Sequence, residues 1–193
     1  MKKVGLYFGT FNPIHIGHLI IANYMAEFSD MDEVWLMVTP HNPFKKKKTL
    51  LDDRHRYELV YRATEPYPKL KPSDAEFGLP QPSYTVHTLA HLEEKYPDIE
   101  FALIMGEDNL HHLHKWKNHD VILRRHDIFV YPRLHGQQTD ARFDHHPRIK
   151  RLDAPVMELS STFIREAIAK GKDIRPMLPH PVWQYIDEMN FYR

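Results

Sequence analysis

The sequence predicts an α/β fold: a doubly wound, Rossmann-like parallel sheet with helices on both faces. Short, continuous apolar runs of strand length alternate along the chain with longer stretches in which apolar residues recur at helical spacing. Such alternation of strand and helix implies parallel strands joined by right-handed crossovers. At 193 residues, without an internal repeat or a low-complexity linker, residues 1–193 are expected to form a single domain.

Four apolar runs have the length expected of buried strands, namely residues 4–8, 34–38, 101–105 and 128–131. In parallel α/β sheets, ligands bind beyond the carboxyl ends of the strands, at the point where the strand order reverses. The residues that follow these four runs are therefore where a functional site is expected.

Four segments are expected to be helical. Between the first two strands, Leu19, Ala22, Met25 and Ala26 recur at helical spacing, and the other three segments are residues 55–64, 86–95 and 162–170. Gly171 stands where a C-terminal helix cap belongs. Residues 40–53 and 134–147 are polar and are expected to be long loops, which in a compact domain are usually functional or disordered.

Composition excludes several classes of protein. Lys plus Arg and Asp plus Glu both number 26, so the chain lacks the net positive charge that non-specific nucleic-acid binding usually needs. No stretch approaches the roughly 18 apolar residues of a membrane span, and the N-terminal apolar run is too short for a signal peptide. There are no cysteines. We expect a cytoplasmic protein without nucleic-acid or membrane partners. A homo-oligomer is possible, but the sequence does not determine the oligomeric state.

The turn after the first strand, residues 9–18, reads GTFNPIHIGH and leads into the first helix. Gly9 allows close approach of the backbone to a ligand. His15 and His18 are three residues apart and fall on one helix face, beside free backbone amides that favour a phosphate. Imidazoles and amides directed at one point suit a site where charge builds up on phosphate oxygens. A histidine pair alone is also typical of a metal half-site and, more often, of capping and packing.

A second candidate anion site lies near the other end of the chain. Ser160, Ser161 and Thr162 open the helix that is expected to end at Gly171, and Arg165 follows about one turn later. Hydroxyl groups at a helix N-terminus cap free amides and also bind phosphate, and the planar guanidinium of Arg165 could reach the same anion. Taken alone, the segment is also typical of an ordinary cap followed by a surface arginine.

Together these segments resemble the two signatures of the nucleotidyltransferase superfamily. His15, Gly17 and His18 match its His-x-Gly-His motif, and residues 160–165 match its Ser-Ser-Thr-x-x-Arg element. The resemblance implies that His15, His18 and Arg165 are catalytic, that they contact the phosphates of ATP, and that Mg²⁺ binds with the nucleotide and needs no protein metal site. The ATP-binding residues implied in this way are Gly9, Thr10, Phe11, Gly17, Gly106, Asp108, Ser160, Ser161 and Thr162.

Other segments resemble the bacterial nicotinate mononucleotide adenylyltransferases within this superfamily. They are Pro82-Ser83-Tyr84-Thr85 and Gly106-Glu107-Asp108 with the following Trp116. The resemblance implies that Thr85 meets the pyridine carboxylate and that Trp116 stacks on the nicotinate ring, although a lone tryptophan is more often a core residue. The remaining acceptor-binding residues implied are Asn12, Asn42, Lys45 and Arg133. The chain departs from the family pattern at Phe44, where histidine is usual, and directly after Arg133.

The resemblance implies an adenylyltransferase that joins ATP and nicotinate mononucleotide to give nicotinate adenine dinucleotide and pyrophosphate, in NAD biosynthesis. Nicotinamide mononucleotide and pantetheine phosphate are the alternative acceptors. A cytidylyltransferase is disfavoured because the Arg-Thr-Glu-Gly-Ile-Ser stretch typical of those enzymes is missing. A non-catalytic nucleotide sensor is disfavoured by the retained histidines and Arg165. Of the 15 histidines, those at 111, 112, 114, 145 and 146 lack a recognised metal-binding spacing and are expected on the surface.

Overall fold

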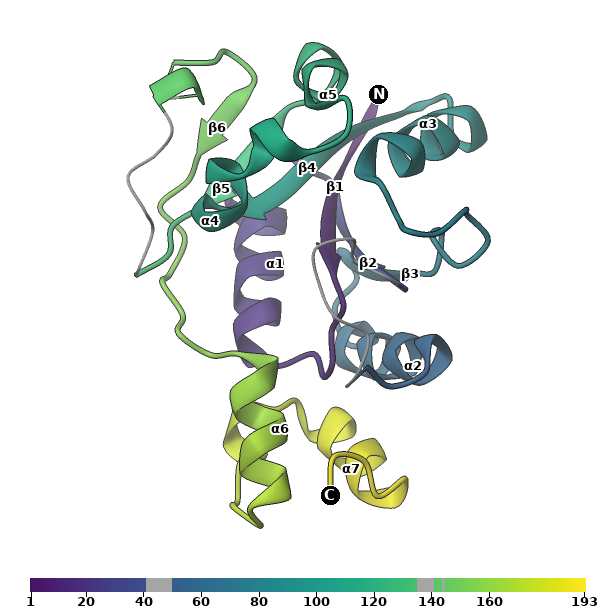
Figure 1. Ribbon diagram of the computed structural model, residues 1–193, viewed down its shortest axis with the longest axis vertical. Helices are drawn as coiled ribbons and strands as arrows, with labels where there is room; N and C mark the ends of the chain where they lie inside the picture. Colours follow the sequence, from purple (N-terminus) through teal and green to yellow (C-terminus); the bar gives the residue numbers. More distant parts are fainter. Residues whose placement is uncertain (41–49, 135–140, 144) are drawn as a thin grey trace.

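The computed structural model describes residues 1–40, 50–134, 141–143 and 145–193. Among these residues, six strands form one parallel sheet in the order β3-β2-β1-β4-β5-β6 (Figure 1). This is the doubly wound arrangement, and the strand order reverses between β1 and β4. The fold class predicted from the sequence is therefore confirmed.

The four predicted strands are present with slightly longer or equal bounds, and two further strands were not predicted. The missed strands are the short edges of the sheet, whose sequences LKPS and IKR contain too few apolar residues for a pattern to be detected. Pro72 in the first of them is typical of an edge strand, because proline cannot donate to the ladder. The strands are β1 (Lys2–Gly9), β2 (Glu33–Val38), β3 (Leu70–Ser73), β4 (Ile99–Gly106), β5 (Ile128–Tyr131) and β6 (Ile149–Arg151).

Helices pack on both faces of the sheet (Figure 1). All four predicted helices are present: the three with predicted bounds end within two residues of them, and the first contains the residues predicted at helical spacing. The helices α4, α5 and α7 were not predicted. One face is covered by α1 (Ile16–Phe28) and α2 (Asp53–Thr64), while α6 (Ser161–Ala169) and α7 (His180–Glu188) extend the same core beyond the carboxyl ends of the strands (Figure 1). The other is covered by α3 (Thr85–Lys95), α4 (Glu107–His111) and α5 (His119–Arg125). Short 3₁₀ turns are η1 (Leu113–Lys115), η2 (Ala141–Phe143) and η3 (Arg175–Met177).

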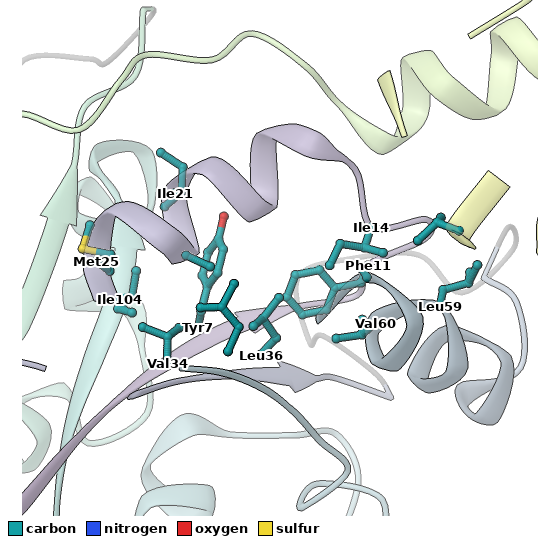
Figure 2. Packing of buried hydrophobic residues seen from close by; sticks show 14 of the residues in the cluster. Tyr7, Phe11, Ile14, Ile21, Met25, Val34, Leu36, Leu59, Val60 and Ile104 are labelled. Atoms are coloured by element: carbon teal, nitrogen blue, oxygen red, sulfur yellow. The ribbon is translucent and has the colours of Figure 1, made fainter. Parts of the chain in front are cut away.

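Two apolar cores lie on opposite sides of the sheet because successive strand residues point to opposite faces. On β1, Val4 and Leu6 face the core beneath α3 and α5, whereas Tyr7 faces the core beneath α1 and α2. Figure 2 shows the second core, in which Phe11 and Ile14 pack with side chains of β2 and α2. Phe11 is 1% exposed and Ile14 is fully buried. The turn that carries the histidines is therefore anchored in the core.

Gly171 closes α6 as predicted, at the position directly after the C-cap residue Lys170. Its φ of +64° is a conformation that glycine adopts without strain, and its N–H donates to the Ile168 carbonyl at 2.8 Å. The next N–H, from Lys172, donates to the Ala167 carbonyl at 2.9 Å. Within the part of the chain that the structure describes, the helices are too short or too polar to cross a bilayer.

Candidate active site

A cavity of about 540 Å³ lies beyond the carboxyl ends of β1, β2, β4 and β5, which is the edge of the sheet where the sequence predicted a site. Side chains from both ends of the chain line it. Of the residues predicted from sequence, those on its surface are Gly9, Thr10, Phe11, Asn12, His15, His18, Asp108, Arg133, Ser160, Ser161, Thr162 and Arg165. The fold therefore brings most of the expected site into one place.

The two histidines form a stacked pair at the start of α1. Their ring centroids are 3.7 Å apart, with an angle of 24° between the rings. The backbone N–H of His15 donates to Nδ1 of His18 at 3.2 Å, so Nδ1 is an acceptor and the proton of a neutral His18 ring lies on Nε2. The three-residue spacing thus fixes both the orientation and the tautomer of His18.

His15 is the more deeply placed of the two, with 3% of its surface exposed. Its Nδ1 is buried and has no hydrogen-bond partner among the described residues. Burial, and secondarily the nearby Arg133 guanidinium, lower the pKa of His15 from 6.5 to about 4. His15 is therefore a neutral imidazole near pH 7.

The N-terminus of α6 is attached directly to the first turn. Ser161 Oγ donates to the Pro13 carbonyl at 2.8 Å, and Arg165 Nη1 donates to the Asn12 carbonyl at 2.9 Å. The segment before α6 runs beside α1 and carries α6 to this point (Figure 1), and the Cβ position at Gly17 is 3.7 Å from Leu159. Ser160 caps the helix by accepting from the Phe163 N–H at 3.1 Å. Segments about 150 residues apart in sequence therefore converge on one cavity.

Arg133 lies beside the histidines and contacts a pair of buried tyrosines that sequence reasoning missed. The Tyr7 and Tyr131 hydroxyl oxygens are 3.3 Å apart, and Arg133 Nη2 donates to Tyr131 Oη at 3.3 Å. Arg133 Nε is 3.6 Å from an Asp108 carboxylate oxygen, which makes an ion pair. Burial raises the pKa of both tyrosines. In the sequence these tyrosines resemble ordinary strand residues. Their position near the ends of β1 and β5 was the signal that could have placed them in the site.

Two predicted glycines lie beside the cavity rather than on its surface. A side chain at Gly106 would collide with the Asp108 carboxylate, and one at Gly17 would lie 3.1 Å from the His15 ring. Gly17 lines a small recess next to the main cavity, together with both histidines and Arg133. Both glycines therefore make room for residues of the site. Gly9, on the main cavity, does the same for Phe11, whose ring is 2.8 Å from the Cβ position.

Two of the predicted acceptor-binding residues are not among the described residues that line this cavity, and two others lie outside the described part of the chain. Thr85 begins α3, and Trp116 packs, partly buried, against the core beneath α3 and α5; neither is among the described residues that line the cavity. Asn42 and Lys45 lie outside the described residues. The acceptor roles of these four residues stay predictions.

Arg56 is a further residue that supports the site. It is fully buried, and its Nη1 donates to the Thr10 carbonyl at 2.7 Å and to the Thr39 carbonyl at 2.9 Å. Its Nε donates to the Leu51 carbonyl at 3.0 Å. Arg56 thus joins the ends of β1 and β2 to the segment before α2. The sequence carried a signal for this, because Arg56 begins the i, i+3, i+4, i+7 pattern of buried positions on α2.

The donor groups of the site suit a metal that arrives with a nucleotide. Within residues 1–40, 50–134, 141–143 and 145–193, no group of three or more His, Asp or Glu is arranged to hold a metal ion. Asp108 is the carboxylate on the described surface of the cavity. Mg²⁺ commonly keeps several waters and binds through substrate phosphates with one or two carboxylates, and the site fits that mode.

Comparison with known proteins shows the family of the chain. Residues 6–167 match the family described as Cytidylyltransferase-like. The chain is 64% identical over 191 residues to a "Probable nicotinate-nucleotide adenylyltransferase" of Flavobacterium johnsoniae, covering 99% of each chain. It is 50% identical to a protein of the same name from Bacteroides fragilis, covering 95% of this chain and 90% of that one.

The fold also matches a solved structure, that of Plasmodium falciparum nicotinic acid mononucleotide adenylyltransferase complexed with NaAD. The TM-score is 0.83 at 19% identity, over 100% of this chain and 98% of that one. At this identity the match supports the fold, while the relatives with higher identity define the family. The chain belongs to the family of nicotinate-nucleotide adenylyltransferases, within the wider Cytidylyltransferase-like family.

Proposed function

We propose that this protein transfers the adenylyl group of ATP to the phosphate of nicotinate mononucleotide, forming nicotinate adenine dinucleotide and pyrophosphate for NAD synthesis. The observation that carries the proposal is the convergence of His15, His18 and Arg165 on one cavity. The names of the full-length relatives support the choice of acceptor, as does the NaAD held by the structural neighbour.

The reaction is an in-line displacement at the α-phosphorus of ATP. A phosphate oxygen of the mononucleotide forms a bond to that phosphorus, while the bond to the bridging oxygen of the β-phosphate breaks and pyrophosphate leaves. The nucleophile is already an anion, so a strong general base is unnecessary. The enzyme must hold two anions within reacting distance while charge moves to the leaving group. Positioning and electrostatic stabilisation are therefore the main sources of the rate enhancement.

The residues of the cavity are suited to that task. His18 offers an Nε2–H donor whose orientation is set by the bond at Nδ1. His15 is neutral near pH 7 and is held against His18. Arg165 supplies a fixed positive charge, and its hydrogen bond to the Asn12 carbonyl ties that charge to the first turn. Mg²⁺ bound with ATP would neutralise part of the triphosphate charge. The positive ends of α1 and α6 add to the same field.

Acceptor binding is assigned to residues of the first turn, of the segment after β5 and of three further segments. Asn12 and Arg133 line the cavity, and Arg133 offers a guanidinium for the acceptor phosphate. We assign Thr85 to the nicotinate carboxylate and Trp116 to the pyridine ring, and we keep Asn42 and Lys45 as acceptor contacts from the segment before α2. Nicotinamide mononucleotide differs only by an amide in place of the carboxylate, so it is the closest competing acceptor.

A pyrophosphate-release assay with ATP and four acceptors tests the proposal. The acceptors are nicotinate mononucleotide, nicotinamide mononucleotide, phosphopantetheine and glycerol phosphate. We expect the highest kcat/KM with nicotinate mononucleotide. His18→Ala should lower kcat by roughly 10²–10³, the effect of losing one preorganised donor. His180→Ala removes an exposed histidine of α7 and should leave kcat unchanged.

Three results would contradict the proposal. Release only with phosphopantetheine would replace the acceptor while leaving the fold intact. Release with none of the four acceptors would reject the enzymatic function, and normal turnover by His18→Ala would reject the role of that imidazole.

A further inference from the structure

The segment that follows α7 returns to the active-site cavity. Tyr192 Oη donates a hydrogen bond to Oδ1 of Asn12 at 2.8 Å, across 180 positions of sequence. Asn12 is 1% exposed and lies on the cavity surface, in the turn that leads to the two histidines. A residue near the C-terminal end of the described chain thus touches a residue assigned to the acceptor.

Asn12 is held by three different parts of the chain. Besides the Tyr192 hydroxyl, its Oδ1 accepts the Leu51 N–H at 3.3 Å, from the segment before α2. Its backbone carbonyl accepts Arg165 Nη1 at 2.9 Å, from α6. The Leu51 N–H can only donate, so a rotation of the carboxamide by 180° would place its NH₂ group against an N–H. With Oδ1 on that side, the Tyr192 hydroxyl donates to the same oxygen and holds it there.

The backbone around Tyr192 is shaped to deliver this contact. Tyr192 has a φ of +65°, a region that bulky residues seldom occupy, whereas Asn190, at +55°, ends α7 at a position where asparagine is common. Phe191 between them anchors the segment, since its ring packs edge-on against His55 at 5.0 Å and against Tyr185 at 5.7 Å between centroids. Its N–H also donates to the Ile186 carbonyl at 3.0 Å. Such unfavourable backbone angles persist only where surrounding contacts hold them.

We propose that Tyr192 is a positioning residue, whose hydroxyl fixes the Asn12 carboxamide in the orientation that acceptor binding requires. The inference rests on the proposed function, in which Asn12 binds the acceptor. Tyr192 itself acts through Asn12 and is not assigned a contact with the reacting atoms. Its removal should therefore affect the acceptor more than ATP, and Asn12 should mediate the whole effect.

The test compares Tyr192→Phe with the wild-type protein in steady-state kinetics. The variant keeps the ring and loses only the hydroxyl. We expect KM for the acceptor to rise about three- to tenfold, the scale of one net hydrogen bond, while KM for ATP changes less than about twofold. The acceptor used is the one that supports turnover in the four-acceptor assay. A wrong assignment of nicotinate therefore appears in the wild-type protein and is distinguished from a failure of the Tyr192 proposal.

Tyr185→Phe is the matched control. It removes a hydroxyl from the same region, one that contacts His55 Nδ1 at 2.8 Å rather than Asn12. Both variants should show similar small decreases in melting temperature, and only Tyr192→Phe should change the acceptor KM. Equal KM changes in the two variants would show a general loosening of the region and would overturn the proposal, as would an unchanged acceptor KM in Tyr192→Phe.

A double-mutant cycle gives a second, independent readout. In an Asn12→Ala background, Tyr192→Phe should cause no further rise in acceptor KM, because the two residues act through one hydrogen bond. Multiplying effects in the double variant would mean that Tyr192 acts by another route, and the proposal would fail.

Discussion

Single residues of this site owe their properties to neighbours that are distant in sequence. His15, His18 and Arg165 were predicted from the sequence, because each belongs to a short motif whose residue types and spacing are visible along the chain. Tyr7, Tyr131 and Arg56 were not predicted as site residues, because each is recognised only by what it contacts in three dimensions. Tyr131 lies in an apolar strand and resembles a core residue in the sequence. Only the structure shows that its hydroxyl contacts Arg133. The protonation state of His15 likewise follows from burial, which sequence does not reveal.

The depressed pKa of His15 predicts a specific dependence of stability on pH. Between its ordinary pKa of 6.5 and its folded value of about 4, the unfolded chain binds a proton at His15 and the folded chain does not. Lowering the pH through this window therefore favours the unfolded state, by an amount on the order of 3 kcal/mol when complete. His15→Gln lacks this contribution. Urea unfolding of both proteins at about pH 7 and about pH 5 should show that the wild-type protein loses more stability on acidification. Parallel losses in the two proteins would contradict the burial argument.

Helices and strands could be predicted from the sequence only where their apolar residues form a clear pattern. The strands β1, β2, β4 and β5 are continuous apolar runs and were found, whereas the edge strands β3 and β6 carry too few apolar residues to be recognised. The short α4 and α5 give no reliable period, because each spans at most two turns. The N-terminal cap of α6 was predictable from Ser160, whereas the hydrogen bonds that attach α6 to the first turn through Ser161 and Arg165 were not predicted.

A substitution at Arg56 tests whether this side chain stabilises the fold by connecting β1, β2 and the segment before α2. Arg56→Lys keeps the charge but loses the planar fork that serves the carbonyls of Thr10, Thr39 and Leu51. Buried carbonyls left without donors cost roughly 1–3 kcal/mol each, so we expect a loss of at least about 2 kcal/mol in the free energy of unfolding. Arg54→Lys, at an exposed position of the same helix, should cost less than about 0.5 kcal/mol. Denaturant titration measures both, and equal costs would contradict the bridging role.

Over the whole molecule, the doubly wound topology explains why the two motifs meet. The reversal of strand order between β1 and β4 opens the sheet edge at the end of β1. The chain then passes from β6 along α1 and places α6 at that same edge (Figure 1). The general location of the site was therefore predictable from the sequence. The acceptor-binding residues were less predictable, because Thr85 and Trp116 are not among the described residues that line the cavity. The other two candidates, Asn42 and Lys45, lie outside the described residues.

The central claim is that the first turn and α6 hold one triphosphate between them. Calorimetric titration with a non-hydrolysable ATP analogue in the presence of Mg²⁺ tests it in four proteins: wild type, His18→Ala, Arg165→Ala and Arg175→Ala. Arg175 is an exposed arginine paired with Asp173 and serves as the matched control. We expect His18→Ala and Arg165→Ala each to raise Kd roughly 10- to 100-fold, the loss of one hydrogen bond to a charged group, and Arg175→Ala to leave it unchanged. Wild-type affinity in Arg165→Ala beside weakened binding in His18→Ala would show that the two motifs do not share one anion.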